Sequence, residues 1–408
     1  MTRNRWLPAP FEWTTEHLGV LAPVTTGSMD NHGTAIGDDL LGGVFTFDPF
    51  TAYAQGRVTN PNLVVLGQLG KGKSAFIKTF LLRELKRGRR AVVLDPKGEY
   101  QSLAAAIGVT PIRLEPGGSI QLNPLRGGPD AASLRTDVAL LVALLEHGLK
   151  RDLTPGERAA LVEARGAVSL MSDATIGAIG NALFEPQSSA AKRLHCSVGA
   201  LQTDGRDLAL ELLRLTEGDL AGMFDDVTSA SCTLDQPLVV LDLSAVWNTK
   251  ALPLVIACAL AWLGGASSNL MSPRYLVLDE AWAVLNDLSV ARWLQGSWKL
   301  ARSTATSNIL VLHRISDVLG VGDRGDQTVA LAAGLLADSG TSVSFQLGTE
   351  DAADAGEILG HGATEIGILP TLGRGVALWR VSGEAHLVRH HVYDHEREMI
   401  DSDQAMRR

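Results

Sequence analysis

The stretch LVVLGQLGKGKSA at residues 63–75 decides the fold, because an apolar run leads into a glycine-rich turn and then into an amphipathic segment. Glycines at the first and sixth positions of the turn let the backbone curl, so that successive N–H groups point inward at a phosphate. Lys73 can reach the β- and γ-phosphate oxygens, and Ser74 offers a hydroxyl to Mg2+ where a helix dipole favours anions. The pattern predicts a strand, a phosphate-binding loop and a helix that hold ATP with Mg2+, and an ordinary glycine turn before a helix is the alternative. The residues predicted to contact the nucleotide are Gly67, Gln68, Leu69, Gly70, Lys71, Gly72, Lys73, Ser74 and Ala75.

Length, composition and charge limit the classes of protein to which this chain can belong. A chain of 408 residues with 46% hydrophobic residues indicates a globular α/β protein of two or three domains. We expect no integral membrane segment and a cytoplasmic location, since the sequence has no run of about twenty apolar residues and residues 1–13 lack the apolar centre of a signal peptide. A net charge of −9 argues against a surface that embraces DNA as a whole, so any DNA contact must be local. Cys196, Cys232 and Cys258 are scattered, which predicts reduced core residues.

Short apolar runs followed by polar residues predict a mainly parallel sheet covered by helices on both faces. Five such runs are expected to form its centre, and two later runs extend it toward one edge. They occupy residues 63–66, 91–94, 238–241, 275–278 and 309–312, and then 341–345 and 376–379.

Between residues 129 and 232 strand patterns give way to helical ones, which predicts an inserted all-helical domain. Apolar residues recur at helical spacing over residues 138–145, and TPGE at 154–157 is a capping box that starts a second helix. The predicted organisation is a lead-in segment at 1–60, the first part of the core at 61–128, the insertion at 129–232, the second part of the core at 233–385 and a tail at 386–408.

A second predicted site element is the apolar strand at 275–278, which ends in Asp279 and Glu280. In this Walker B arrangement Asp279 holds Mg2+ through water, and Glu280 orients and polarises the water that attacks the γ-phosphate. An acidic pair that only caps the next helix is the alternative interpretation. His313 follows the run at 309–312 and is a candidate γ-phosphate sensor, or else a histidine satisfied at a strand end. Glu99 follows the strand at 91–94 and could support the magnesium shell or couple the site to a neighbour.

Basic residues at 83–90 fall where the helix after the phosphate loop should end. Cations there complement the helix dipole, and a DNA-binding patch is the less favoured interpretation. AHLVRHHVYDH at 385–395 could suggest a metal site, but its alternation favours a closing strand followed by a solvated tail.

Four segments together resemble the conjugative type IV secretion ATPases of the HerA and FtsK superfamily of RecA-like motors. They are LDPKGEY at 94–100, LNPL at 122–125, LDLS at 241–244 and LDEAW at 278–282. The resemblance runs from about residue 45 to residue 379 and includes the helical insertion. It departs where the family usually has glutamine and this chain has His313-Arg314, and where secretion members usually carry a large N-terminal domain before the phosphate loop.

The resemblance implies a RecA-like P-loop core and a homo-oligomer, a hexamer in that family, with ATP at subunit interfaces and an arginine supplied by the neighbour. Arg302, about twenty residues after the acidic pair, and Arg374, between two glycines, are the candidates for that arginine. The resemblance also implies secretion or conjugation partners at the inner face of the cell membrane.

Three function classes follow. The first is a Mg2+-dependent ATPase motor that powers conjugative DNA transfer or type IV secretion. The second is a double-stranded DNA translocase of the HerA or FtsK kind, and the third is a scaffold that binds ATP without hydrolysing it. Lys73, Ser74, Asp279 and Glu280 argue against the scaffold, since such scaffolds tend to lose the catalytic carboxylate.

Overall fold

A computed structural model describes residues 33–169, 171, 174–266, 272–299, 304–319 and 327–400. Its strands are β1 (Thr34–Asp39), β2 (Val44–Phe47), β3 (Leu63–Leu66), β4 (Arg90–Asp95), β5 (Ile112–Arg113), β6 (Leu238–Asp242), β7 (Arg274–Leu278), β8 (Thr306–Leu312), β9 (Thr341–Ser344), β10 (Val376–Val381) and β11 (Glu384–His390). Its helices are α2 (Pro49–Ala54), α3 (Lys73–Lys86), α4 (Gln101–Ile107), α5 (Ala131–Leu149), α6 (Pro155–Ala167), α7 (Ile176–Phe184), α8 (Ser188–Arg193), α9 (Val198–Thr216), α10 (Leu252–Ala266), α11 (Trp282–Leu285), α12 (Leu288–Lys299), α13 (Ser316–Leu319), α14 (Gln327–Ala337), α15 (Thr349–Leu359), α16 (Ala363–Ile368) and α17 (Arg397–Ile400).

The strands form one sheet in the order β2-β1-β11-β10-β9-β3-β8-β7-β4-β6-β5. Pairing is parallel from β9 through β3, β8, β7, β4 and β6 to β5, and antiparallel from β9 through β10, β11 and β1 to β2. The predicted mainly parallel sheet between helices is therefore confirmed, and each of the seven predicted apolar runs lies in a strand. The run at 341–345 is one residue longer than β9.

Side chains alternate between two cores because successive residues of a strand face opposite ways. In β3, Val64 and Leu66 belong to the core that includes α10 and α12, whereas Leu63 and Val65 belong to the core that includes α3 and α4. Both faces of the central strands are therefore buried, as a parallel sheet requires.

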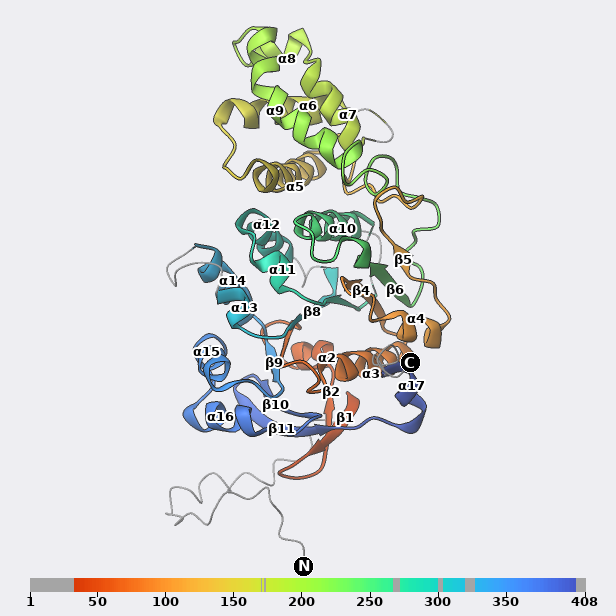
Figure 1. Cartoon of the computed structure of the whole chain (residues 1–408), viewed down its shortest axis with the longest axis vertical. Helices are drawn as coiled ribbons and strands as arrows, with labels where there is room; N and C mark the ends of the chain where they lie inside the picture. The colour runs from red at the N-terminus through yellow and green to blue at the C-terminus, as the bar shows by residue number, and fades with distance from the viewer. Residues whose placement is uncertain are drawn as a thin grey trace, which may run out of the picture.

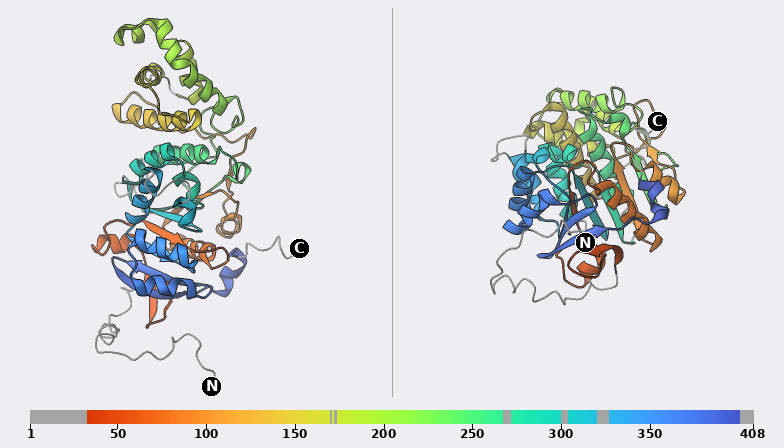
Figure 2. Two further views of the ribbon diagram at one scale, coloured as in Figure 1. Left: turned by 60° about the vertical axis from the view of Figure 1, so that its left-hand side comes forward. Right: turned by 60° about the horizontal axis from the view of Figure 1, so that its bottom comes forward.

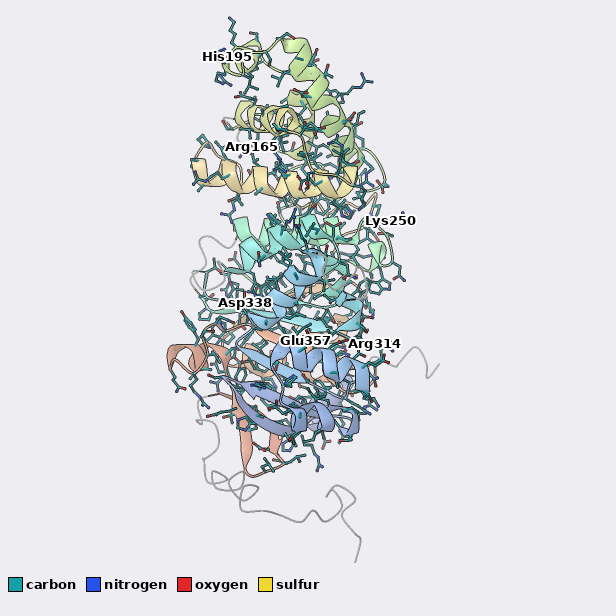
Figure 3. All side chains as sticks on the ribbon, turned by 90° about the vertical axis from the view of Figure 1, so that its left-hand side faces the viewer. Arg165, His195, Lys250, Arg314, Asp338 and Glu357 are labelled. Carbon is teal, nitrogen blue, oxygen red and sulfur yellow. The ribbon has the colours of Figure 1, made fainter. Side chains whose placement is uncertain are left out.

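The described part of residues 131–216 is helical and forms a unit at one end of the molecule, whereas β1, β2, β10 and β11 lie toward the other end (Figures 1 and 2). Helix α5 of this unit packs on α10 and α12, which separate it from the sheet. Within the unit Arg165 and Asp137 form a fully buried ion pair at 2.8 Å that joins α6 to α5, and Figure 3 places Arg165 among these helices. The expected capping box at Thr154 and Glu157 starts α6.

The two ends of the described chain take part in the sheet. Strands β1 and β2 lie within the range predicted as a lead-in segment, and β11 extends into the range predicted as a tail. Strand β11 pairs with both β10 and β1, which confirms the closing strand expected at 385–395. His386 and His391 contact Asp39 and Asp38 at 2.8 and 2.7 Å. The described residues hold no group of three or more His, Cys, Asp or Glu side chains arranged to bind a metal ion.

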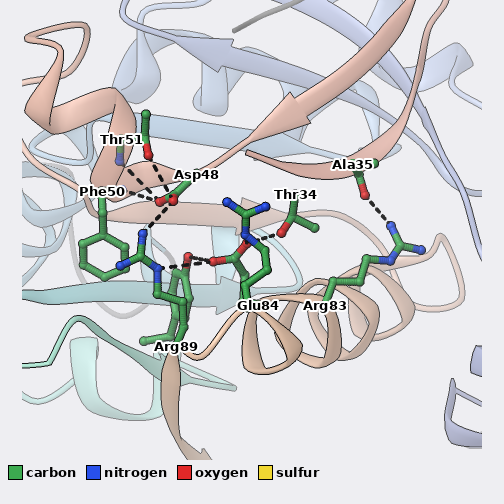
Figure 4. Close-up of polar contacts among 10 residues, drawn as sticks. Thr34, Ala35, Asp48, Phe50, Thr51, Arg83, Glu84 and Arg89 are labelled. Carbon is green, nitrogen blue, oxygen red and sulfur yellow. Dashed lines mark hydrogen bonds and ion pairs between the residues drawn. The ribbon is translucent and has the colours of Figure 1, made fainter. Parts of the chain in front are cut away.

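The basic residues at 83–90 lie in the last turn of α3, in the turn after it and at the start of β4, and Arg83 and Arg89 contact acidic side chains and the carbonyl oxygen of Ala35 in β1 (Figure 4). Arg89 bonds Asp48 at 2.8 Å and lies near the buried Glu84 carboxylate, and Arg83 bonds Glu396 at 2.7 Å. These contacts join the end of α3 to β1, β2 and the C-terminal segment, so the interpretation of this cluster as structural is the one the geometry supports.

Burial settles the expectation about the cysteines. Cys258 lies in the apolar helix α10, which is buried beside the sheet. The expectation of three core cysteines is wrong for two of them, because Cys258 is buried but Cys196 is exposed after α8 and Cys232 is only half-buried in a loop. None of the helices within the described ranges is long and apolar enough to cross a membrane.

Candidate functional site

The phosphate loop follows β3 and leads into α3, as the sequence predicts. Gly72 is the residue before the helix and has a φ of 118°, and Gly67 has a φ of 148°. A Cβ at Gly67 would lie 2.5 Å from the Cβ of Phe345, and one at Gly72 would lie 3.2 Å from the Cα of Gly375. Both positions therefore require glycine for conformation and for space.

Segments from the C-terminal part of the chain form one wall of this loop. The N–H of Gln68 donates to Gln346 O at 2.9 Å, and the N–H of Gly375 donates to Lys71 O at 2.9 Å. The turn that carries the exposed Arg374 therefore lies against the phosphate loop of its own chain. The other candidate arginine, Arg302, lies outside the described residues.

Lys73 is the first residue of α3 and is buried. Its ammonium donates to the carbonyl oxygens of Gly67 and Gln68, at 3.2 Å in the latter case, and lies 2.9 Å from Nδ1 of His313. A phosphate in the loop would take over these contacts. Burial lowers the pKa of Lys73 to about 8, although the charges of Asp279 and Glu280 act to raise it.

Asp279 and Glu280 directly follow β7, and His313 directly follows the neighbouring strand β8. His313 Nε2 lies 2.6 Å from Oε1 of Glu280. If Nδ1 accepts from the Lys73 ammonium and the Nε2–H donates to Glu280, both contacts of the imidazole are satisfied. The structure thus brings three predicted residues, from the start of α3 and from the ends of β7 and β8, into one continuous chain of contacts.

The surroundings shift the pKa values of the two carboxyl groups of the acidic pair in opposite directions. Burial, followed by the charges of Glu280 and Glu99, raises the pKa of Asp279 to about 7. Burial would also raise the pKa of Glu280, but hydrogen bonds from His313 and Lys97 lower it to about 2. Glu280 has a φ of 53°, which for a residue other than glycine or asparagine is strained backbone. A strained residue in a buried charged cluster is typical of a functional site.

The loop after β4 brings the charged residues of DPKGEY to the same end of the sheet. Asp95 accepts the backbone N–H groups of Glu99 and Tyr100 at 3.0 and 2.8 Å and so shapes the loop. Burial raises the pKa of Asp95 to about 6 despite these bonds. The charge of Glu99 acts on the pKa of both Lys73 and Asp279.

Sequence reasoning missed three residues around Glu280. Lys97 forms an ion pair with Oε1 of Glu280, and Trp282 donates from Nε1 to Oε2 at 2.6 Å. Trp247, from the loop after β6, lies with its ring centroid 5.0 Å from Lys97 Nζ and 6.1 Å from that of Trp282. Lys97 and Trp282 lie within the DPKGEY and DEAW segments, so these two motifs were the sequence signal that could have identified both residues. Nothing in the sequence around Trp247 pointed to the site.

The residues fit a magnesium nucleotide. Ser74 is in the first turn of α3, where its hydroxyl can ligate a metal, and Asp279 supplies a buried carboxylate whose charge reaches Lys73. Oxygen donors of this kind are the ones that Mg2+ prefers, with phosphate oxygens and water completing its shell.

No protein-family model and no curated protein matches this sequence. Solved structures do match. VirB4 of Thermoanaerobacter pseudethanolicus is similar with a TM-score of 0.74 and 22% identity, over 91% of this chain and 100% of that chain. The plasmid coupling protein TrwB with the ATP analogue ADPNP gives a TM-score of 0.57 and 16% identity, over 82% of this chain and 86% of that one. TrwB with ADP and Mg2+ gives 0.54 and 17%, over 84% and 87%. The chain therefore has the P-loop α/β fold of VirB4 and of the conjugative coupling protein TrwB.

Proposed function

We propose that the chain is a Mg2+-dependent ATPase motor that powers conjugative DNA transfer or type IV secretion. The observation that carries this proposal is the contact chain from Lys73 through His313 to Glu280, at the ends of three adjacent parallel strands beside the phosphate loop. Ligands of open α/β sheets bind at this carboxyl end of the strands. The likeness to VirB4 and TrwB supports the same class of motor.

In the proposed reaction, backbone N–H groups of the loop and Lys73 hold the β- and γ-phosphates. Ser74 and Asp279 would hold Mg2+, which would supply charge neutralisation for the phosphates. Glu280 orients and polarises the attacking water, and His313, at the place of the family's glutamine, links that carboxylate to Lys73 and senses the γ-phosphate.

The experiment that tests this function compares Glu280→Gln with the wild type. We expect the variant to bind a fluorescent ATP analogue with wild-type affinity and to release phosphate about 10²–10⁴-fold more slowly, the usual contribution of a general base. Glu357→Gln, on the exposed surface of α15 (Figure 3), is the matched control and should keep the wild-type rate. Equal, measurable rates for wild type and Glu280→Gln would refute the role of Glu280, and lack of phosphate release in both would favour the scaffold alternative.

We further propose that the active form is a homo-oligomer, a hexamer, that acts on the cytoplasmic side of the membrane with other secretion or conjugation components. Mass in solution measured by light scattering with and without ATP and Mg2+ tests the assembly. A monomer under both conditions would contradict it.

Turnover in the presence of duplex DNA separates the secretion motor from the double-stranded DNA translocase. Stimulation that falls steeply with salt concentration would favour the translocase, because phosphate contacts release counterions. No response to duplex DNA would favour secretion.

A further inference from the structure

The carboxylate of Glu280 is surrounded by protein donors. Oε1 receives both the Lys97 ammonium and the His313 Nε2–H, and Oε2 receives the Trp282 indole N–H. A carboxylate that orients water needs an oxygen directed at that water. Three of the about four acceptor positions of the carboxylate are filled, both of those on Oε1 among them, and the side chain is only 4% exposed, so a donor that leaves Oε1 frees that oxygen for the water.

Lys97 is the donor whose position depends on a distant loop. Its ammonium lies between the carboxylate of Glu280 and the face of the Trp247 ring, 5.0 Å from the ring centroid. Both partners attract a cation, so the place of Lys97 is set by the two together. His313 and Trp282, in contrast, are held by strand β8 and by the turn that follows Glu280 itself.

The loop at 244–250, which carries Trp247, contacts the inserted helical unit. His147 of α5 lies 3.3 Å from Lys250 O through Nε2 and 2.5 Å from Asp287 through Nδ1. Asp287 in turn accepts the N–H of Val290 at the start of α12, shortly after Glu280 in the chain. Figure 3 shows Lys250 between the helical unit and the sheet. One side chain of α5 therefore touches both the Trp247 loop and the segment that follows the acidic pair.

We propose that Lys97 and Trp247 form a latch that holds Glu280 away from the attacking water, and that the inserted helical unit opens it by moving the loop at 244–250. This inference rests on the proposed ATPase function. Lys97 is a positioning residue in this arrangement, because it acts through Glu280. A motor with such a latch hydrolyses ATP slowly until a substrate or partner displaces the helical unit.

The test measures kcat and nucleotide affinity for Lys97→Met and Trp247→Leu in the full chain. We expect each to raise kcat severalfold while the dissociation constant of a fluorescent ATP analogue stays unchanged, since neither residue contacts the phosphate loop. The double variant should be no faster than Lys97→Met alone, because both substitutions open the same latch. Lys97→Arg keeps a cation that can pair with Glu280 and stack on Trp247, so it should retain the wild-type rate.

Two further variants serve as a control and as a test of the helical unit. Lys250→Met removes a lysine charge from the exposed end of the same loop and should leave kcat unchanged. His147→Leu removes the two polar contacts of the His147 side chain, which in this arrangement hold the loop at 244–250 in the latched position, and should raise kcat as Lys97→Met does; an unchanged kcat would overturn the role given to the helical unit. Unchanged analogue affinity and melting temperature establish that each variant is folded.

Every outcome decides the proposal. A Lys97→Met variant that is slower than wild type, or equal to it, overturns the latch, and a slower one would place Lys97 on the transferring phosphate. Lack of turnover in wild type together with turnover in Lys97→Met supports the latch, whereas lack of turnover in both overturns it. Glu280→Gln in the Lys97→Met background separates failure of the proposed ATPase mechanism from failure of the latch. If that double variant stays as fast as Lys97→Met, the proposed role of Glu280 fails. If it is inactive, the role of Glu280 holds and the rates of the Lys97 variants bear on the latch alone.

Discussion

Nucleotide affinity should fall as pH rises through 8, because the ammonium of Lys73 is held in a buried site that lowers its pKa to about 8. Only the protonated side chain attracts phosphate, so above this pH the protein must first take up a proton in order to bind. The pKa of the free site is lower than that of the nucleotide-bound site, where the phosphates stabilise the charge. Affinity is therefore complete below the lower value and is lost as pH rises above it.

The size of the effect follows from the fraction of Lys73 that is protonated. With a pKa of about 8, that fraction is roughly 0.9 at pH 7 and roughly 0.1 at pH 9, so the dissociation constant should rise about tenfold, or ~1.4 kcal/mol. A lysine with an ordinary pKa near ~10.4 would stay almost fully charged over this range and would give a nearly flat curve.

The assay is titration of a fluorescent ADP analogue between pH 7 and pH 9. EDTA is included so that binding of Mg2+ does not contribute. Lys73→Arg is the matched control: its guanidinium stays charged, so any pH dependence of its affinity comes from other groups such as Asp279, and the difference in slope between wild type and this variant is the contribution of Lys73. A wild-type dissociation constant that changes less than twofold, or an equal slope in Lys73→Arg, would refute the reasoning.

Three other predictions concern the oligomer, the helical unit and the loop. Arg374 lies in a turn that contacts the phosphate loop of its own chain, so it should act on the site of its own subunit. If Arg374→Ala and Glu280→Gln are each inactive, mixing them should not restore phosphate release. Restored release would show that Arg374 acts across subunits. Asp137→Asn leaves Arg165 buried without its charged partner and should lower the free energy of unfolding by about 3–5 kcal/mol, measured by urea denaturation. Gly67→Ala should abolish binding of the ATP analogue and destabilise the fold by about 1–3 kcal/mol, and wild-type affinity would contradict the strain argument.

The parallel half of the sheet could be predicted because its strands are buried on both faces and appear in the sequence as unbroken apolar runs, as in LVVL at 63–66 and at 238–241 (LVVL within LVVLD). Strands β1 and β2 gave no such signal. TAIGDD at 34–39 contains a glycine and two aspartates, and its pairing with β2 is irregular between Ala35 and Gly37. Its place in the sheet comes from contacts with β11, more than 340 residues later in the chain, where Gly37 pairs with His390.

At the site, residues with a motif were predictable and residues without one were not. Lys73, Asp279 and Glu280 follow from the spacing of glycines and from carboxylates after an apolar strand. His313 followed from the order of strands, because β8 is the neighbour of β7. The contact of Trp247 with Lys97 depends on how the loop after β6 lies over the end of β4, which local sequence does not encode.

The pocket at the phosphate loop can form only after Gln346 and Gly375 have been synthesised, because their backbone groups form one wall of the loop. The ribosome makes the glycine-rich turn well before these two residues. A nascent chain that stops before β9 has the motif but neither of the two residues that form this wall. Binding of a nucleotide by a truncated chain should therefore require that the chain extend past both residues, even though a shorter chain already contains the phosphate-loop motif.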